Sequence, residues 1–318
     1  MTSGCWKSPQ TQEAAGATFR FLKDAPNLRL LRLDYLPFHS FDTADSAVMR
    51  TTHLLPHLRD FTVVGDSRIP QSVISDILAA SNRQVSHLHL WNARRAISPI
   101  PSERLDFGGN LQSLRLGGHR PIEDFQPLPR GLVGLREMRL AQLDGQSGVR
   151  ARELLAEVAP SLEKLTIDSG DVNEIVVSFP LLTRLTRLSL SSVPASPDSP
   201  LLPPSLVSLQ FVSDENLLPL LDRWNAEPSL LPAPFQQINI RRVHDHRTFT
   251  RLPPFVRFGT RYQISLIFHL RRLASRTLPF KALEVYFDHW YLDEIEAVEA
   301  ECKRLEVAFS RRMEDDWA

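Results

Sequence analysis

A short apolar pattern recurs along most of the chain and constrains its fold more than any other feature. In the clearest copies, apolar residues occupy positions one, four and six of a six-residue unit, as in LEKLTI from Leu162. Eleven copies occur, and they start 21 to 30 residues apart. Periods of roughly 20–50 residues are typical of chains that stack one supersecondary unit on the next. The sequence therefore predicts a repeat protein.

The pattern inside each copy favours a strand over a helix. Positions four and six are apolar in all eleven copies, and position five is polar in all eleven. Successive side chains of a strand point to opposite faces, whereas a helix would place positions four and six about 200° apart. We therefore predict an α/β solenoid, curved like a horseshoe, with a parallel sheet of about eleven short strands. Positions four and six enter the core, and positions three, five and seven face outward. The copies start at Leu28, Leu58, Val85, Leu111, Leu135, Leu162, Leu185, Leu206, Phe235, Gly259 and Phe280.

The connections between copies differ in kind. Apolar residues at helical spacing predict helices over 69–81, 148–159 and 215–225. Pro219 falls inside the third segment and is tolerable only in the first turn of a helix. Other connections are rich in proline and predict irregular or extended chain on the convex side.

The ends of a repeat stack need covers, because each end would otherwise expose the core. Residues 293–312 carry one narrow apolar stripe that includes Val298 and Cys302, so we predict a C-terminal capping helix over this range. Residues 1–292 form the predicted solenoid with an N-terminal covering segment, and residues 313–318 form an acidic tail.

Composition narrows the function classes. The 37 basic and 37 acidic side chains cancel, which argues against nucleic acid or an anionic membrane as partner. Two cysteines are too few for a disulfide framework or a structural zinc site. The sequence shows no signal peptide and no long apolar segment, so we expect a monomer in the cytoplasm or nucleus without a cofactor.

The repeats carry a family resemblance. In the stretches APNLRLLRL, APSLEKLTI and PPSLVSLQF, the chain resembles leucine-rich repeat proteins, and in style the repeat regions of fungal F-box/leucine-rich-repeat proteins. The resemblance covers roughly residues 20–290 and implies a substrate-recognition role in a cullin-type ubiquitin ligase. Two features depart from the family. Position nine lacks the usual ladder of Asn or Cys, and no F-box is recognisable in the 27 residues before the first repeat.

The predicted outward positions contain the candidate partner-binding residues. Concave faces of repeat solenoids serve as extended protein-binding surfaces. Basic side chains from successive copies, beside an exposed tryptophan, suggest a grip on an acidic or phosphorylated segment of another protein. An ordinary solvated polar face is the alternative. The candidate residues are His87, His89, Trp91, Arg115, Glu137, Arg139, Lys164, Thr166 and Arg187.

Catalytic and metal-binding motifs are poorly represented. His87 and His89 have the spacing that some metal-dependent hydrolases use, and this is the alternative function that the sequence leaves open. No neighbouring acidic or histidine set completes such a site in the sequence, and no phosphate-binding or nucleophile motif is present. We therefore expect a non-enzymatic interaction module, with no catalytic, cofactor-binding or metal-binding residue.

Overall fold

The computed structural model divides the chain into two compact units, Met1–Leu162 and Glu163–Ala318. This boundary falls inside a repeat, whereas the sequence predicts one continuous solenoid. The structure describes residues 25–34, 55–65, 74, 77–79, 81, 84–92, 100–101, 106–118, 125–126, 129–141, 143, 145–168, 172–191, 202–212, 217–241, 282–286 and 292–312. The predicted N-terminal covering segment and the acidic tail lie outside the described residues.

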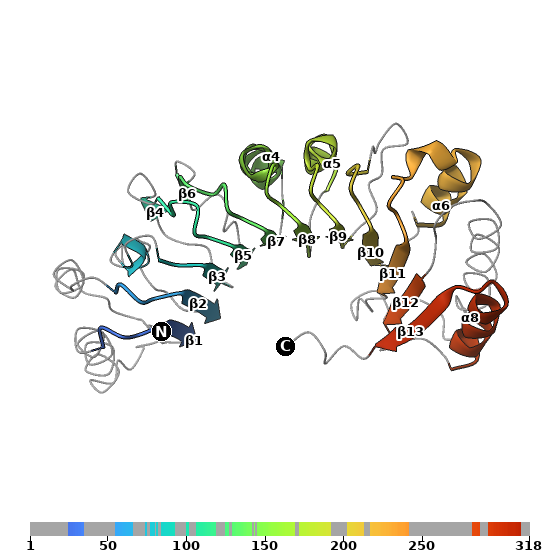
Figure 1. The fold of residues 1–318 in the computed structure, drawn as a ribbon, viewed down its shortest axis with the longest axis horizontal. Coiled ribbons are helices and arrows are strands. Elements are labelled where there is room, and N and C mark those ends of the chain that lie inside the picture. The colour runs from blue at the N-terminus through green and yellow to red at the C-terminus, as the bar shows by residue number, and fades with distance from the viewer. Residues whose placement is uncertain are drawn as a thin grey trace, which may run out of the picture. The chain divides into compact units, whose positions relative to one another are not determined.

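Five parallel strands form the main sheet of the first unit (Figure 1). Position three of one repeat pairs with position three of the next, from Leu30 opposite Asp60 to Ser113 opposite Glu137. The carbonyl at position two of each of the first four repeats accepts two backbone N–H groups from the following repeat, at 2.8–3.0 Å. The strands are β1 (Leu30–Asp34), β2 (Asp60–Gly65), β3 (His87–Asn92), β5 (Ser113–Gly118) and β7 (Glu137–Leu140).

The apolar positions of these repeats form the core of the first unit. Phe61, Leu88 and Met138 at position four are at most 1% exposed, whereas the position-five residues between the apolar sites are exposed or half-buried. Position six, and position one from the second repeat onward, are buried in the same way, with Leu111 and Leu116 no more than 1% exposed. This alternation confirms the strand assignment and the predicted inward and outward positions.

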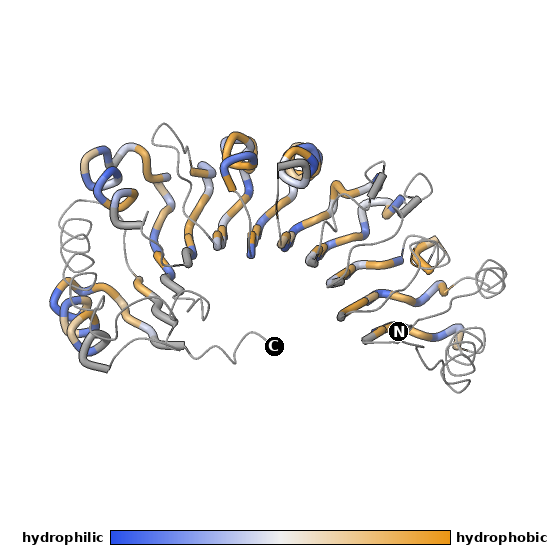
Figure 2. Tube along the Cα trace, turned by 180° about the vertical axis from the view of Figure 1, so that it is seen from behind, coloured by the Kyte–Doolittle hydropathy of each residue, from blue (hydrophilic) through white to orange (hydrophobic). Residues whose placement is uncertain are grey.

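Helices and short strands connect the repeats of the first unit. Helix α4 (Gly145–Val158) buries Leu154, Leu155 and Val158, which is the apolar face that the sequence predicts. A proline-rich connection forms β4 (Ile100–Pro101), which pairs with β6 (Phe125–Gln126) in a separate two-stranded sheet. Figure 2 shows apolar residues along the strands and mixed colours on the helices, as expected for helices that cover a core with one face.

Six parallel strands form the main sheet of the second unit, again in register from repeat to repeat. The connections include α5 (Asn173–Val176), η2 (Phe179–Leu181), α6 (Leu217–Ala226) and η3 (Pro228–Leu230). Pro219 lies in the first turn of α6, as helix geometry requires. The strands are β8 (Lys164–Ile167), β9 (Arg187–Leu190), β10 (Ser208–Val212), β11 (Gln237–Arg241), β12 (Ala282–Tyr286) and β13 (Ala308–Arg312).

The C-terminal part of this unit corrects two predictions. Strand β11 pairs directly with β12, so the tenth copy of the pattern, from Gly259, does not stand between them. The predicted helix over 293–312 ends early: α8 spans Leu292–Arg304, and residues 308–312 form β13 beside β12. A tight turn with Glu306 at φ 57° separates α8 from this last strand.

Candidate protein-binding face

The outward face is defined here as the side chains at positions three, five and seven of the strands. In the first unit it contains six of the predicted binding residues: His87, His89, Trp91, Arg115, Glu137 and Arg139. The other three, Lys164, Thr166 and Arg187, lie on β8 and β9 of the second unit. The predicted set is therefore divided between two units, and each part is described separately.

Trp91 is the central residue of the outward face of the first unit. It stands at position seven of β3, directly opposite Gly117 of β5. The indole lies against this glycine, since a Cβ atom at position 117 would be 2.0 Å from Trp91 Cε3. A side chain larger than hydrogen at position 117 would displace the ring, so the glycine holds open the space in which the indole lies.

Two neighbouring side chains orient the same indole. The ring of His89 meets Trp91 edge to face, with centroids 6.0 Å apart and an interplanar angle of 76°. The Arg139 guanidinium carbon lies 5.4 Å from the centre of the Trp91 ring, within cation–π range. Trp91 remains half-buried, so it combines a fixed position with accessible apolar surface. Large, ordered aromatic side chains of this kind are common anchors of protein interfaces.

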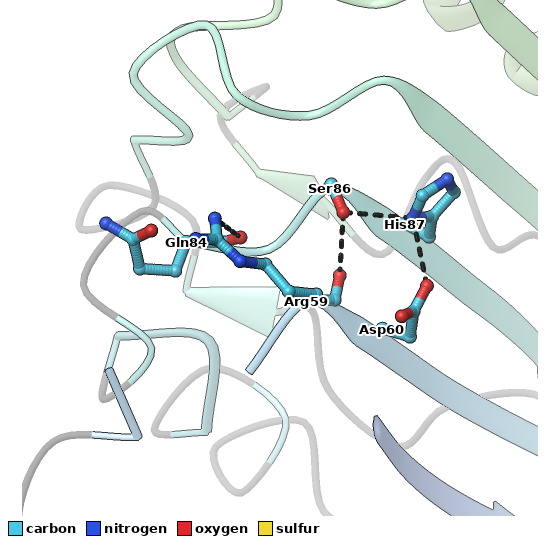
Figure 3. A network of polar contacts seen from close by, with 5 residues as sticks. All are labelled: Arg59, Asp60, Gln84, Ser86 and His87. Carbon is cyan, nitrogen blue, oxygen red and sulfur yellow. Dashed lines mark hydrogen bonds and ion pairs between the residues drawn. The ribbon is translucent and has the colours of Figure 1, made fainter. Parts of the chain in front are cut away.

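A polar network lies at the position-three end of β2 and β3 (Figure 3). His87 Nδ1 is 2.9 Å from Asp60 Oδ1 and 2.9 Å from Ser86 Oγ. Ser86 Oγ also donates to the carbonyl oxygen of Arg59 at 3.3 Å, and the Arg59 guanidinium donates to the carbonyl oxygen of Gln84. These contacts join the two strands beside the outward face.

The combination of serine, histidine and aspartate in this network raises the question of hydrolytic chemistry. In a catalytic triad the carboxylate and the nucleophile contact different ring nitrogens, so that the histidine can move a proton between them. Here both Asp60 and Ser86 contact Nδ1 of His87. This geometry fixes the imidazole but does not activate Ser86 as a nucleophile.

A metal site and a reactive thiol lack support in the part of the chain that the structure describes. No group of three His, Cys, Asp or Glu side chains in the described ranges is placed to share a metal ion. Burial, with smaller contributions from Glu301 and Glu299, raises the pKa of the Cys302 thiol to about 12. The thiol is therefore protonated at neutral pH and is a poor nucleophile. No described helix has the length and hydropathy needed to cross a bilayer.

The strand register also gives the repeat positions of the predicted basic side chains. In the first unit, His89, Arg115 and Arg139 all occupy position five of neighbouring strands. In the second unit, Lys164 and Arg187 pair at position three, whereas position five carries Thr166. The basic residues therefore come from successive strands within each unit but occupy two different positions of the repeat.

Sequence reasoning missed Asp60, Ser86 and Gly117. Asp60 and Gly117 could have been found by aligning all the repeats, because each occupies the same repeat position as the residue that it contacts. Ser86 precedes the strand at position two and carries no recognisable signal. Comparison with protein-family models and with curated proteins finds no match to this chain.

Proposed function

We propose that this chain is a protein-binding module of the leucine-rich repeat class, and that it holds its partner on the outward face of the first unit. The observation that supports the proposal is the geometry around Trp91. The indole lies on Gly117, is flanked by His89 and Arg139, and still offers accessible apolar surface. A preformed aromatic anchor loses little side-chain entropy when a partner binds.

Two substitutions test this function in different ways. Trp91→Ala removes the anchor, and Gly117→Ala keeps the indole but displaces it, because the new Cβ would overlap the ring. Val133→Ala is the matched control, since Val133 is an apolar side chain with 67% exposure in the turn before β7, away from the outward face. All three proteins should retain their circular dichroism spectrum, because none loses a residue of the core.

The readout is affinity purification from a lysate of the source organism, followed by mass spectrometry. We expect at least one protein that the wild type and Val133→Ala retain but that both Trp91→Ala and Gly117→Ala lose. Loss of a truncated hot-spot residue costs at least about 2 kcal/mol, which corresponds to roughly 30-fold in affinity. If all four baits retain the same proteins, the outward face of the first unit is not the binding site.

The resemblance to fungal F-box/leucine-rich-repeat proteins supports a narrower role. We propose substrate recognition for a cullin-type ubiquitin ligase, which would place the protein in the cytoplasm or nucleus. Cullin-ligase subunits should then copurify with the wild type and also with Trp91→Ala, because the anchor serves the substrate and not the ligase. Their absence from both purifications would remove the ligase role and leave the binding face as a scaffold or an inhibitor.

A further inference from the structure

On β2, β3, β5 and β7 of the first unit, charge is separated into two rows of the outward face. Position three carries Asp60, His87, Ser113 and Glu137, and both carboxylates that these four strands place on the outward face belong to that row. Position five carries Thr62, His89, Arg115 and Arg139, and both arginines belong to this second row. A segment that crosses the strands over position five therefore meets cationic side chains and no acidic side chain of that row.

Arg115 and Arg139 stand directly opposite each other in the register of β5 and β7. Neighbouring strands are about 4.8 Å apart, and like charges directly opposite each other destabilise a sheet. Glu137 is a carboxylate on β7 that is positioned to offset part of this repulsion. Glu137 Oε1 lies 3.6 Å from Arg115 Nη2, and both side chains are partly exposed.

The neighbouring aromatic ring fixes one of these arginines. The Arg139 guanidinium packs against Trp91, and Trp91 is itself held on Gly117. The Arg115 side chain is 41% exposed and contacts Glu137 at a distance longer than an ordinary hydrogen bond. A stronger anion can therefore displace Glu137 from Arg115 without breaking a buried interaction.

Building on the proposed function, we propose that Arg115 and Arg139 together bind one carboxylate or phosphate group on an extended segment of the partner protein. Guanidinium groups pair with both anions through parallel N–H···O bonds. The bound anion would relieve the repulsion between the two arginines, and Trp91 would pack against an apolar side chain of the same segment. Acidic and phosphorylated side chains share this chemistry.

The second unit supplies a matched comparison for this pair. Lys164 and Arg187 also stand opposite each other on neighbouring parallel strands, at position three. None of the aromatic contacts described for Trp91 involves either of them. The double variant Lys164→Ala/Arg187→Ala removes two positive charges from a like-charged pair of the second unit, more than either Arg115→Ala or Arg139→Ala removes from the first.

The test uses the full chain and four oriented peptide arrays with degenerate flanks. The fixed central residue is glutamate, phosphoserine, glutamine or lysine. We expect retention on the glutamate and phosphoserine arrays to exceed that on the glutamine array by at least about tenfold, the factor expected for charge-assisted hydrogen bonds. Comparison of the glutamate and phosphoserine arrays then identifies which source of the anion is preferred.

Four variants connect any preference to the two arginines. Arg115→Ala and Arg139→Ala should each remove most of the preference for anions, whereas the double variant in the second unit should leave it unchanged. Glu137→Gln should act in the opposite direction and raise retention on the anionic arrays, because it removes the internal competitor for Arg115. If Arg115, Arg139 and Glu137 only stabilised the fold, the arginine variants and Glu137→Gln would not change retention on the anionic arrays in opposite directions.

The outcomes separate this inference from the proposed function. Retention that is equal on the glutamate, phosphoserine and glutamine arrays, but lost in Trp91→Ala, would overturn the anion site and support the binding face. An equal loss in the double variant of the second unit would also overturn it, because the effect would then follow overall charge. Retention on none of the arrays would count against both the anion site and the binding of extended segments.

Discussion

Position five of the repeat has different surroundings in the two units. In the first unit it carries His89, Arg115 and Arg139, which are half-buried beside an accessible tryptophan. In the second unit, β10 and β11 place Gln210 and Asn239 there, and each is only 8% exposed. The repeat fixes where position five points but not its chemistry or its exposure. We therefore expect substitutions at this position to alter binding in the first unit and folding on β10 and β11 of the second.

The largest effect should come from position four, where the two units are alike. Leu114 on β5 and Leu188 on β9 are each 2% exposed. Leu114→Ala and Leu188→Ala should each lower the free energy of unfolding by about 2–5 kcal/mol, through lost burial and the cavity that remains. Urea denaturation followed by circular dichroism measures the loss. A loss below about 1 kcal/mol in one unit alone would show that the cores of the units differ.

Position five should then distinguish the units. The Nδ2 group of Asn239 donates to Ser208 Oγ at 3.5 Å, and its Oδ1 atom accepts no hydrogen bond from any part of the chain that the structure describes. Asn239→Asp buries a charge without compensation, so it should lower the free energy of unfolding by about 1–3 kcal/mol at pH 7. Burial should raise the pKa of the new carboxyl group, so the loss should shrink towards pH 4.

The matched control for this substitution is Thr62→Asp, at position five of β2 in the first unit. Thr62 is half-buried, so solvent can still reach a carboxylate there. The midpoint of urea denaturation should change little for this variant at either pH. Equal losses for Asn239→Asp and Thr62→Asp would contradict the contrast in exposure between position five of β11 and position five of β2.

The turns offer a smaller contrast. Gly131 in the first unit has φ 74°, and a Cβ there would lie 2.4 Å from the backbone nitrogen of Gly108. Glu306 in the second unit occupies the same left-handed region, at φ 57°, with a side chain. Left-handed backbone costs a residue with a Cβ about 1–2 kcal/mol. Gly131→Ala should therefore lower the thermal midpoint, and Glu306→Gly should raise it.

The turn geometry is tested by whether the thermal midpoints of Gly131→Ala and Glu306→Gly shift in opposite directions. Scanning calorimetry of both variants and the wild type measures these midpoints. If Glu306→Gly lowered the midpoint, the flexibility gained by the unfolded glycine variant would outweigh the strain that the glutamate imposes.

Most of the strand framework could be predicted from the sequence, because burial on one face of each strand forces strict alternation. The exception is β13. Its register with β12 places Glu306 at position one and Arg311 at position six, so the apolar pattern is missing there. Charged residues are tolerated on strands at the end of a sheet, where one side has no neighbouring strand. The tenth copy shows the converse, since its pattern matches but β11 and β12 pair directly without it.

Less of the candidate site could be predicted. Trp91 and the arginines follow from their outward positions, but the contact between Trp91 and Gly117 depends on the register between strands. The difference in exposure between Arg115 and Asn239 depends on what surrounds each strand. A repeat pattern contains no information about those surroundings, because it specifies which positions enter the core and not what covers the outward ones.

The smallest effect should come from Glu157 on α4 of the first unit. Burial raises the pKa of its carboxyl group above the ordinary value of 4.5, and a hydrogen bond from the backbone N–H of Leu132 partly offsets this rise. Since the folded state holds the proton more tightly than the unfolded state, ionisation of Glu157 lowers stability as pH rises. Glu157→Gln keeps an acceptor for Leu132 without the charge, so it should raise the thermal midpoint slightly at pH 7. The gain should vanish at pH 4, where the wild-type carboxyl group is itself protonated.

Glu153→Gln on the same helix is the control, because Glu153 pairs with Arg150 at 2.9 Å and should give no such gain. A gain for Glu157→Gln that persists at pH 4 would show that its origin is not the charge.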